Sequence, residues 1–138
     1  MSDYEVLDIG PFEAWGEAVT RTGAKGKRFV DHELATQYVG ASANAAAPGE
    51  GAPFWHSHSR LEEVYIFLEG RGQMGLDDDV IDVGPGSVVR VGQGVWRIWR
   101  CAPDSPGELR MLCVRSGPGL LAEVGSDAER DTERPKPW

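Results

Sequence analysis

Two histidines and a glutamate lie close together in the segment HSHSRLEEVYIFLEG, which covers residues 56–70. His56 and His58 are two residues apart, and in an extended chain side chains at this spacing project to the same face. The polar residues 59–62 suit a turn that returns Glu63 beside the two imidazoles. Because imidazole and carboxylate together bind zinc, iron, manganese, nickel or copper, these three residues predict a divalent-metal site. Three ligands leave coordination positions open, as in catalytic sites.

Short apolar stretches separated by turns must position these side chains. The chain has 138 residues with 18 glycines and 9 prolines, which is enough for one compact domain rich in tight turns. Strands are expected at residues 36–43, 63–68, 73–76, 80–83, 88–91, 95–100 and 109–114. Turns are expected at residues 70–72, 77–79, 84–86, 92–94 and 103–107. Many short strands between such turns predict an all-β sandwich or barrel.

The spacing of the histidines and the glutamate resembles the first motif of the cupin superfamily, G(x)5HxH(x)3-4E(x)6G. His56, His58, Glu63 and Gly70 fit this motif, and the leading glycine is displaced by one position. The resemblance covers about residues 37–115. It implies an all-β cupin fold, a jelly-roll β-barrel. It implies no single activity, because cupins include dioxygenases, isomerases, lyases, storage proteins and ligand sensors.

The second cupin motif, G(x)5PxG(x)2H(x)3N, falls on residues 86–101 and is matched in part. Gly86 and Gly94 agree with it, whereas Gly92, Arg97 and Cys101 stand in place of the proline, the ligand histidine and the asparagine. A guanidinium is permanently protonated and has no lone pair for a metal. The resemblance therefore implies a site of three protein ligands with an arginine in place of the fourth.

Strand parity places further side chains around this site. If Arg97 and Glu63 face the barrel interior, alternate residues of their strands face it as well. The side chains assigned to the interior in this way are Tyr65, Phe67, Val95, Trp99 and Cys101. We therefore predict that Arg97, Tyr65, Phe67 and Trp99 contact a bound small molecule. No general base is identified, and Tyr65 is a candidate proton carrier.

Two alternatives follow for Arg97. In the first, His56, His58 and Glu63 hold a metal as a 2-His-1-carboxylate triad. Repulsion between the metal centre and a guanidinium at 4 Å would then be on the order of 8 kcal/mol at an effective dielectric near 20. Arg97 must therefore swing away or clamp an anion, such as a 2-oxo acid, a sugar acid or a carboxylated aromatic. The reaction could be that of a dioxygenase, an isomerase or a lyase.

In the second alternative, Arg97 pairs with Glu63 and takes up the carboxylate that a metal would need. The barrel would then be a metal-free ligand-binding or sensing module, with Tyr65, Phe67 and Trp99 as walls for an apolar or aromatic ligand. A third interpretation is an interaction scaffold without a small-molecule ligand. The sequence leaves all three open.

The charge and hydropathy of the chain limit the classes of partner and the location that we expect for this protein. The net charge of −8 argues against nucleic acid or an anionic membrane as the main partner. No window approaches the roughly 18 apolar residues of a membrane span. The first residues lack the pattern of a signal peptide, so a cytoplasmic location is expected. Val64, Ile66 and Leu68 make the outward face of their strand apolar too, which favours a homodimer.

The chain is expected to divide into a short amino-terminal extension (1–35), a cupin barrel (36–118) and a charged, mobile tail (119–138). In the extension, Phe12, Trp15 and Val19 recur at helical spacing and predict an apolar stripe packed on the barrel. Residues 21–28, which include Lys25 and Lys27, lack a phosphate-loop pattern and are expected to form a solvated loop.

Overall fold

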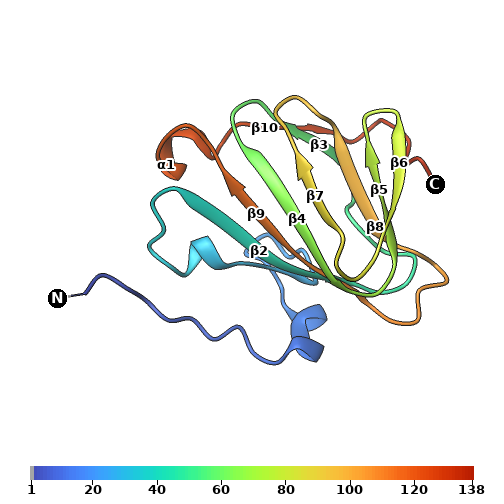
Figure 1. Cartoon of the computed structure of the whole chain (residues 1–138), viewed down its shortest axis with the longest axis horizontal. Coiled ribbons are helices and arrows are strands. Elements are labelled where there is room, and N and C mark those ends of the chain that lie inside the picture. Colours follow the sequence, from blue (N-terminus) through green and yellow to red (C-terminus); the bar gives the residue numbers. More distant parts are fainter. Residues whose placement is uncertain (1) are drawn as a thin grey trace.

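The computed structural model describes residues 2–138 and consists of two antiparallel five-stranded sheets that face each other (Figure 1). In order across the first sheet, the strands are β1 (Lys27–Phe29), β2 (Val39–Ala46), β9 (Leu109–Ser116), β4 (Glu62–Glu69) and β7 (Val88–Val91). Across the second sheet they are β10 (Ala128–Asp131), β3 (Trp55–His58), β8 (Arg97–Cys101), β5 (Gly72–Leu76) and β6 (Asp79–Val83). The short helices are η1 (Phe12–Glu17), η2 (Val30–His32) and α1 (Leu121–Val124).

The core lies between the two sheets and is built by alternation along the strands. In β4, Glu63, Tyr65 and Phe67 are buried, whereas Leu68 is exposed. The apolar core cluster consists of Ala46, Tyr65, Phe67, Met74, Val83, Val91, Trp99, Cys101, Leu109, Met111 and Cys113. The predicted all-β jelly roll is confirmed, and all seven expected strands are present, residues 88–91 with the predicted bounds and the other six with shifted ones; β1, β3 and β10 were not expected. The helices of residues 2–138 are too short and too polar to cross a membrane.

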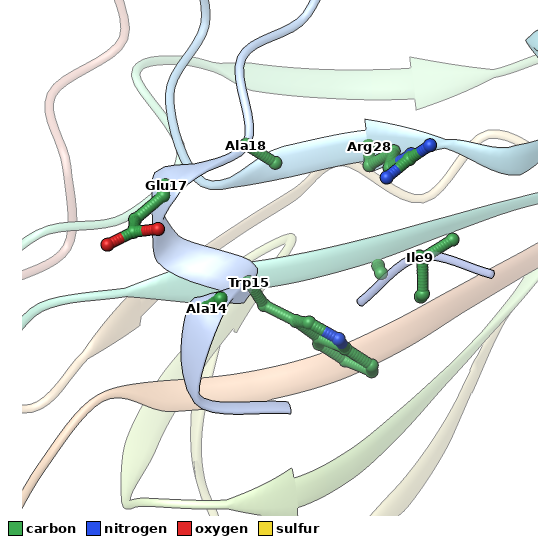
Figure 2. A pocket seen from close by; sticks show the side chains of 7 residues that line it. Ile9, Ala14, Trp15, Glu17, Ala18 and Arg28 are labelled. Atoms are coloured by element: carbon green, nitrogen blue, oxygen red, sulfur yellow. The ribbon is translucent and has the colours of Figure 1, made fainter. Parts of the chain in front are cut away.

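The amino-terminal extension lies against the first sheet through η1, which contacts β1 and β2. Phe12 and Trp15 form an edge-to-face pair with ring centroids 5.0 Å apart, and the Arg110 guanidinium lies 4.8 Å from the Phe12 ring centroid. Figure 2 shows Trp15 and Arg28 beside a pocket of about 240 Å³ at this junction. Val19 is 63% exposed and does not complete the predicted stripe.

The segment predicted to be a solvated loop, residues 21–28, instead leads into β1. In this strand Lys27 pairs with Asn44 of β2, and Phe29 pairs with Ser42. Gly26 has a φ of 76°, and a Cβ at this position would lie 2.2 Å from the Ala45 carbonyl oxygen. The glycine therefore allows the backbone to approach β2 closely enough for an edge strand to form.

The segment 119–138, expected to be a mobile tail, has ordered contacts in the structure. β10 pairs with β3 along its whole length and runs beside it in Figure 1. Beyond β10, the Pro135 carbonyl accepts a hydrogen bond of 3.0 Å from Trp55 Nε1, and the Arg134 guanidinium lies 3.9 Å from the Trp55 ring centroid. Because Trp55 and Ile98 face outward from the second sheet, the tail removes this apolar surface from water.

Candidate metal site and its cavity

The three predicted metal ligands converge between the two sheets. His56 and His58 come from β3, and Glu63 comes from β4. His56 Nε2 lies 3.4 Å from Glu63 Oε1, and His58 Nε2 lies 3.7 Å from Glu63 Oε2. The candidate ligand atoms all lie within 4.8 Å of one another. Ligand atoms around a metal with bonds of about 2.1 Å are roughly 3.0 to 3.4 Å apart, so this donor set fits a divalent ion after small adjustments.

Both imidazoles present their Nε2 atoms to the glutamate. His58 Nδ1 lies 2.7 Å from Asp127 Oδ1, so this nitrogen is the donor and Nε2 keeps its lone pair. Burial alone would raise the pKa of Asp127, but hydrogen bonds from His58 and from the Leu61 and Arg60 amides lower it below its usual value. Burial lowers the pKa of His56, which favours the neutral ring.

Glu63 is an ionised carboxylate at the centre of this cluster. Although burial raises its pKa, contacts with the two imidazoles and with Arg97 outweigh that effect and hold the pKa well below its usual range. The Tyr65 hydroxyl donates to Glu63 Oε1 at 2.8 Å, and the Cys113 thiol donates to Oε2 at 3.2 Å. Burial raises the pKa of both Tyr65 and Cys113, so both donors keep their protons at neutral pH.

Arg97 is fully buried and lies next to the candidate ligand Glu63. It is the register partner of His56 across β3 and β8, so its side chain starts on the same face of the sheet. Its Nε lies 3.6 Å from Glu63 Oε1, and its Nη2 donates to the Gly92 carbonyl at 3.4 Å. Nε and Nη1 have no hydrogen-bond partner within residues 2–138. The arginine therefore supports Glu63 electrostatically but makes few hydrogen bonds.

A cavity of about 300 Å³ opens beside the candidate ligands. Of the four residues predicted to contact a ligand, Tyr65 and Trp99 line it, whereas Phe67 and Arg97 are buried outside its lining. The lining also holds a set of cationic and aromatic side chains, namely Lys27, Arg115, Arg130, Phe29 and Phe54. A contact between Arg97 and a molecule in this cavity would therefore require the arginine to move.

Among the residues of the site that sequence reasoning missed, Lys27, Asp127 and Cys113 lie nearest the candidate ligands or support them. Lys27 was assigned to a solvated loop, Asp127 to a mobile tail, and Cys113 only to a buried strand. The expected inward parity of Tyr65 extends to Cys113, its register partner across β4 and β9. No local pattern predicts Lys27 or Asp127, because each reaches the site through pairing of distant segments.

Comparison with known proteins identifies the family. A cupin-domain family model matches residues 45–115, which is about half of the chain. The chain belongs to the cupin family. No curated protein matches this cupin. Among solved structures, it is similar to a cupin protein from Bacteroides fragilis, with 26% identity, a TM-score of 0.71 and coverage of 86% of this chain and 88% of that one.

Other structural relatives are more distant. A cupin-like protein from Thermotoga maritima has 19% identity, a TM-score of 0.56 and coverage of 69% of this chain and 76% of that one. Pac13 from Streptomyces, a nucleoside dehydratase, has 12% identity, a TM-score of 0.54 and coverage of 68% of each chain. At these identities the likeness concerns the fold alone, so the chemistry must be argued from this cupin's own site.

Proposed function

We propose that this cupin binds a divalent metal ion through His56, His58 and Glu63 and binds or transforms a small anionic molecule in the adjoining cavity. The observation that carries the proposal is the convergence of two imidazoles and a carboxylate at separations close to those of a coordination sphere. Iron, manganese, zinc, nickel and copper all suit this donor set.

The charges around the site support an anionic ligand. A divalent ion and Arg97 would together bring three positive charges, against one negative charge each from Glu63 and Asp127. The resulting surplus is partly buried, where effective dielectric constants are low and charges interact strongly. Glu63 contacts Arg97 and both imidazoles, so it reduces the repulsion expected between metal and guanidinium. A carboxylate-bearing ligand would neutralise the remaining charge.

The residues around the cavity define what the protein itself would contribute to chemistry. A bound divalent ion would act as a Lewis acid that polarises an oxygen of the ligand. Tyr65 and Trp99 present flat surfaces that orient an aromatic or planar molecule. The Tyr65 hydroxyl stays protonated and donates a hydrogen bond to Glu63, which makes it the candidate proton donor beside the ligands. The reaction type, whether dioxygenation, isomerisation or lyase chemistry, is left open.

A specific contact favours the alternative function, a metal-free binding or sensing module. Arg97 Nε is 3.6 Å from Glu63 Oε1, so the expected ion pair is present in the structure. In this state the charges of Arg97 and Glu63 balance without a metal. The long separation and the two unpartnered arginine nitrogens make the pair a poor compensation for burying two charges. For this reason we place the metal-binding function first.

Elemental analysis of the purified protein distinguishes the two functions. Near-stoichiometric metal that disappears in His56→Ala and persists in His32→Ala supports the metal-binding function, because His32 lies outside the ligand group. Metal that appears only in Arg97→His, where an imidazole would stand beside His56, supports a metal-free module with a lost fourth ligand. Absence of metal from all four proteins after growth with added metal salts would contradict the proposal.

A homodimer and a cytoplasmic location stay predictions. On the outer face of the first sheet, Leu68 is 39% exposed and Val88 is 63% exposed. These exposed apolar side chains are the observation that supports association of two copies. Sedimentation velocity at several protein concentrations measures the oligomeric state directly, and a mass equal to one chain at all concentrations would contradict the dimer.

A further inference from the structure

Lys27 brings a positive charge into the cavity from the edge of the first sheet. It is the first residue of β1, and its register partner on β2, Asn44, is buried. The Lys27 side chain lines the same cavity as His56 and Glu63. The cavity therefore has a metal-binding part, formed by β3 and β4, and a cationic part contributed by β1.

The Lys27 ammonium differs from its neighbours Arg28 and Arg115 in having no carboxylate partner. Arg28 forms a bidentate pair with Glu33, and Arg115 pairs with Asp31 at 2.7 Å. Within residues 2–138 no carboxylate oxygen lies within 4.0 Å of Lys27 Nζ, whose nearest aromatic neighbour is the Phe29 ring at 5.1 Å. Burial lowers the pKa of Lys27, which reflects the cost of holding this charge away from water.

An anion bound in the cavity would offset the free-energy cost of holding the Lys27 charge away from water. The cavity lining holds Lys27, Arg115 and Arg130, of which only Arg115 has a carboxylate partner, and its only acidic residue is Glu63. This local positive surplus contrasts with the net charge of −8 of the whole chain. A confined surface of one sign concentrates small ions of the opposite sign. The aromatic walls beside it favour an organic anion with a planar body over a small inorganic one.

Lys27 is better placed than Arg97 to bind the ligand. Arg97 is fully buried and lies outside the cavity lining, where its nearest charged atom is Glu63 Oε1. Lys27 lies on the lining and has no ion-pair partner to give up. The clamp that the sequence assigned to Arg97 can therefore be supplied from β1 without disturbing the metal ligands.

We propose that Lys27 binds the carboxylate of a small, planar organic acid and so determines the selectivity of the cavity for anions. The proposal rests on the proposed function in that it names the residue that recognises the anionic ligand. It requires no contact between that carboxylate and the metal. Lys27 binding and metal binding can therefore be tested separately.

The test compares benzoate with benzamide, its neutral counterpart of similar shape, by titration monitored with NMR. We expect the wild-type protein to bind benzoate at least tenfold more tightly than benzamide, because the carboxylate gains charge-assisted hydrogen bonds. Lys27→Met should remove this preference, and Lys27→Arg should retain most of it. Lys25→Met is the matched control, since Lys25 is exposed and does not line the cavity, and it should behave as the wild type.

Two results would overturn the proposal: no preference for benzoate in the wild type, or an unchanged preference in Lys27→Met. Repeating the titrations after removal of metal with a chelator separates this inference from the metal site. A Lys27-dependent preference that persists in the stripped protein would support the anion site, and failure of the same protein to take up added metal would contradict the metal-binding function alone. If Lys27→Met binds stoichiometric metal and still prefers benzoate to benzamide, the anion site is contradicted and the metal-binding function is supported.

Discussion

Asp127→Asn should weaken metal binding although Asp127 is not itself among the candidate ligands. Asp127 Oδ1 accepts a hydrogen bond from His58 Nδ1 at 2.7 Å, and Oδ2 accepts from the Arg60 and Leu61 amides at 2.6 and 2.8 Å. An asparagine has one oxygen and one NH₂ group, so it can satisfy both sides only if either the two amides or His58 Nδ1 meets the NH₂ group in place of an oxygen.

The structure indicates which side asparagine would satisfy. Turning the NH₂ group toward the two amides of Arg60 and Leu61 would remove two hydrogen bonds to a charged group, at about 1.5 to 3 kcal/mol each. The amide oxygen should therefore stay with the backbone, and the NH₂ group should face His58 Nδ1. That nitrogen must then accept a hydrogen bond, which moves the ring proton to Nε2 and removes the lone pair that faces Glu63.

We expect the metal dissociation constant of Asp127→Asn to rise 10- to 100-fold, the range found when partners of metal-binding histidines are changed. This corresponds to about 1.4 to 2.7 kcal/mol. The assay is competition for the metal with a chromophoric chelator. Glu129→Gln is the matched control, because it makes the same acid-to-amide change on β10 at an exposed residue. A dissociation constant for Asp127→Asn within twofold of the wild-type value would refute the reasoning.

Two further predictions concern stability. In metal-free protein, the folded state lowers the pKa of Glu63, so this residue contributes stability that is complete above its unfolded pKa of about 4.3 and is lost as the pH falls. Urea unfolding at several pH values should therefore show the advantage of wild type over Glu63→Gln constant above about pH 5 and shrinking steadily as the pH is lowered further; a difference independent of pH would contradict this. Deleting residues 134–138 should lower the free energy of unfolding by about 2 to 3 kcal/mol, because Trp55 loses its partner Pro135 and becomes exposed. An unchanged urea midpoint would show that the tail contributes little.

Local patterns in the sequence predicted seven of the ten strands and the candidate ligands. The period of two that makes a strand also sets which side chains share a face, so the convergence of His56 and His58 could be predicted from their spacing alone. The inward parity of Glu63 and Tyr65 followed from the same rule, and both side chains meet in the structure. The spacing of the ligands within one short segment made the family resemblance detectable, and the family-model match confirmed it.

The positions of the charged residues around the candidate ligands depend on pairing between distant segments. Asp127 is 69 residues from His58, and Lys27 reaches the cavity only because β1 joins the edge of the first sheet. Burial of Arg97 likewise depends on how β3, β8 and β4 are arranged, because its parity predicted the correct face but not its depth. A single sequence contains the period of each strand but not the register between strands far apart. The ligands could therefore be predicted from the sequence, whereas their supporting charges required the tertiary structure.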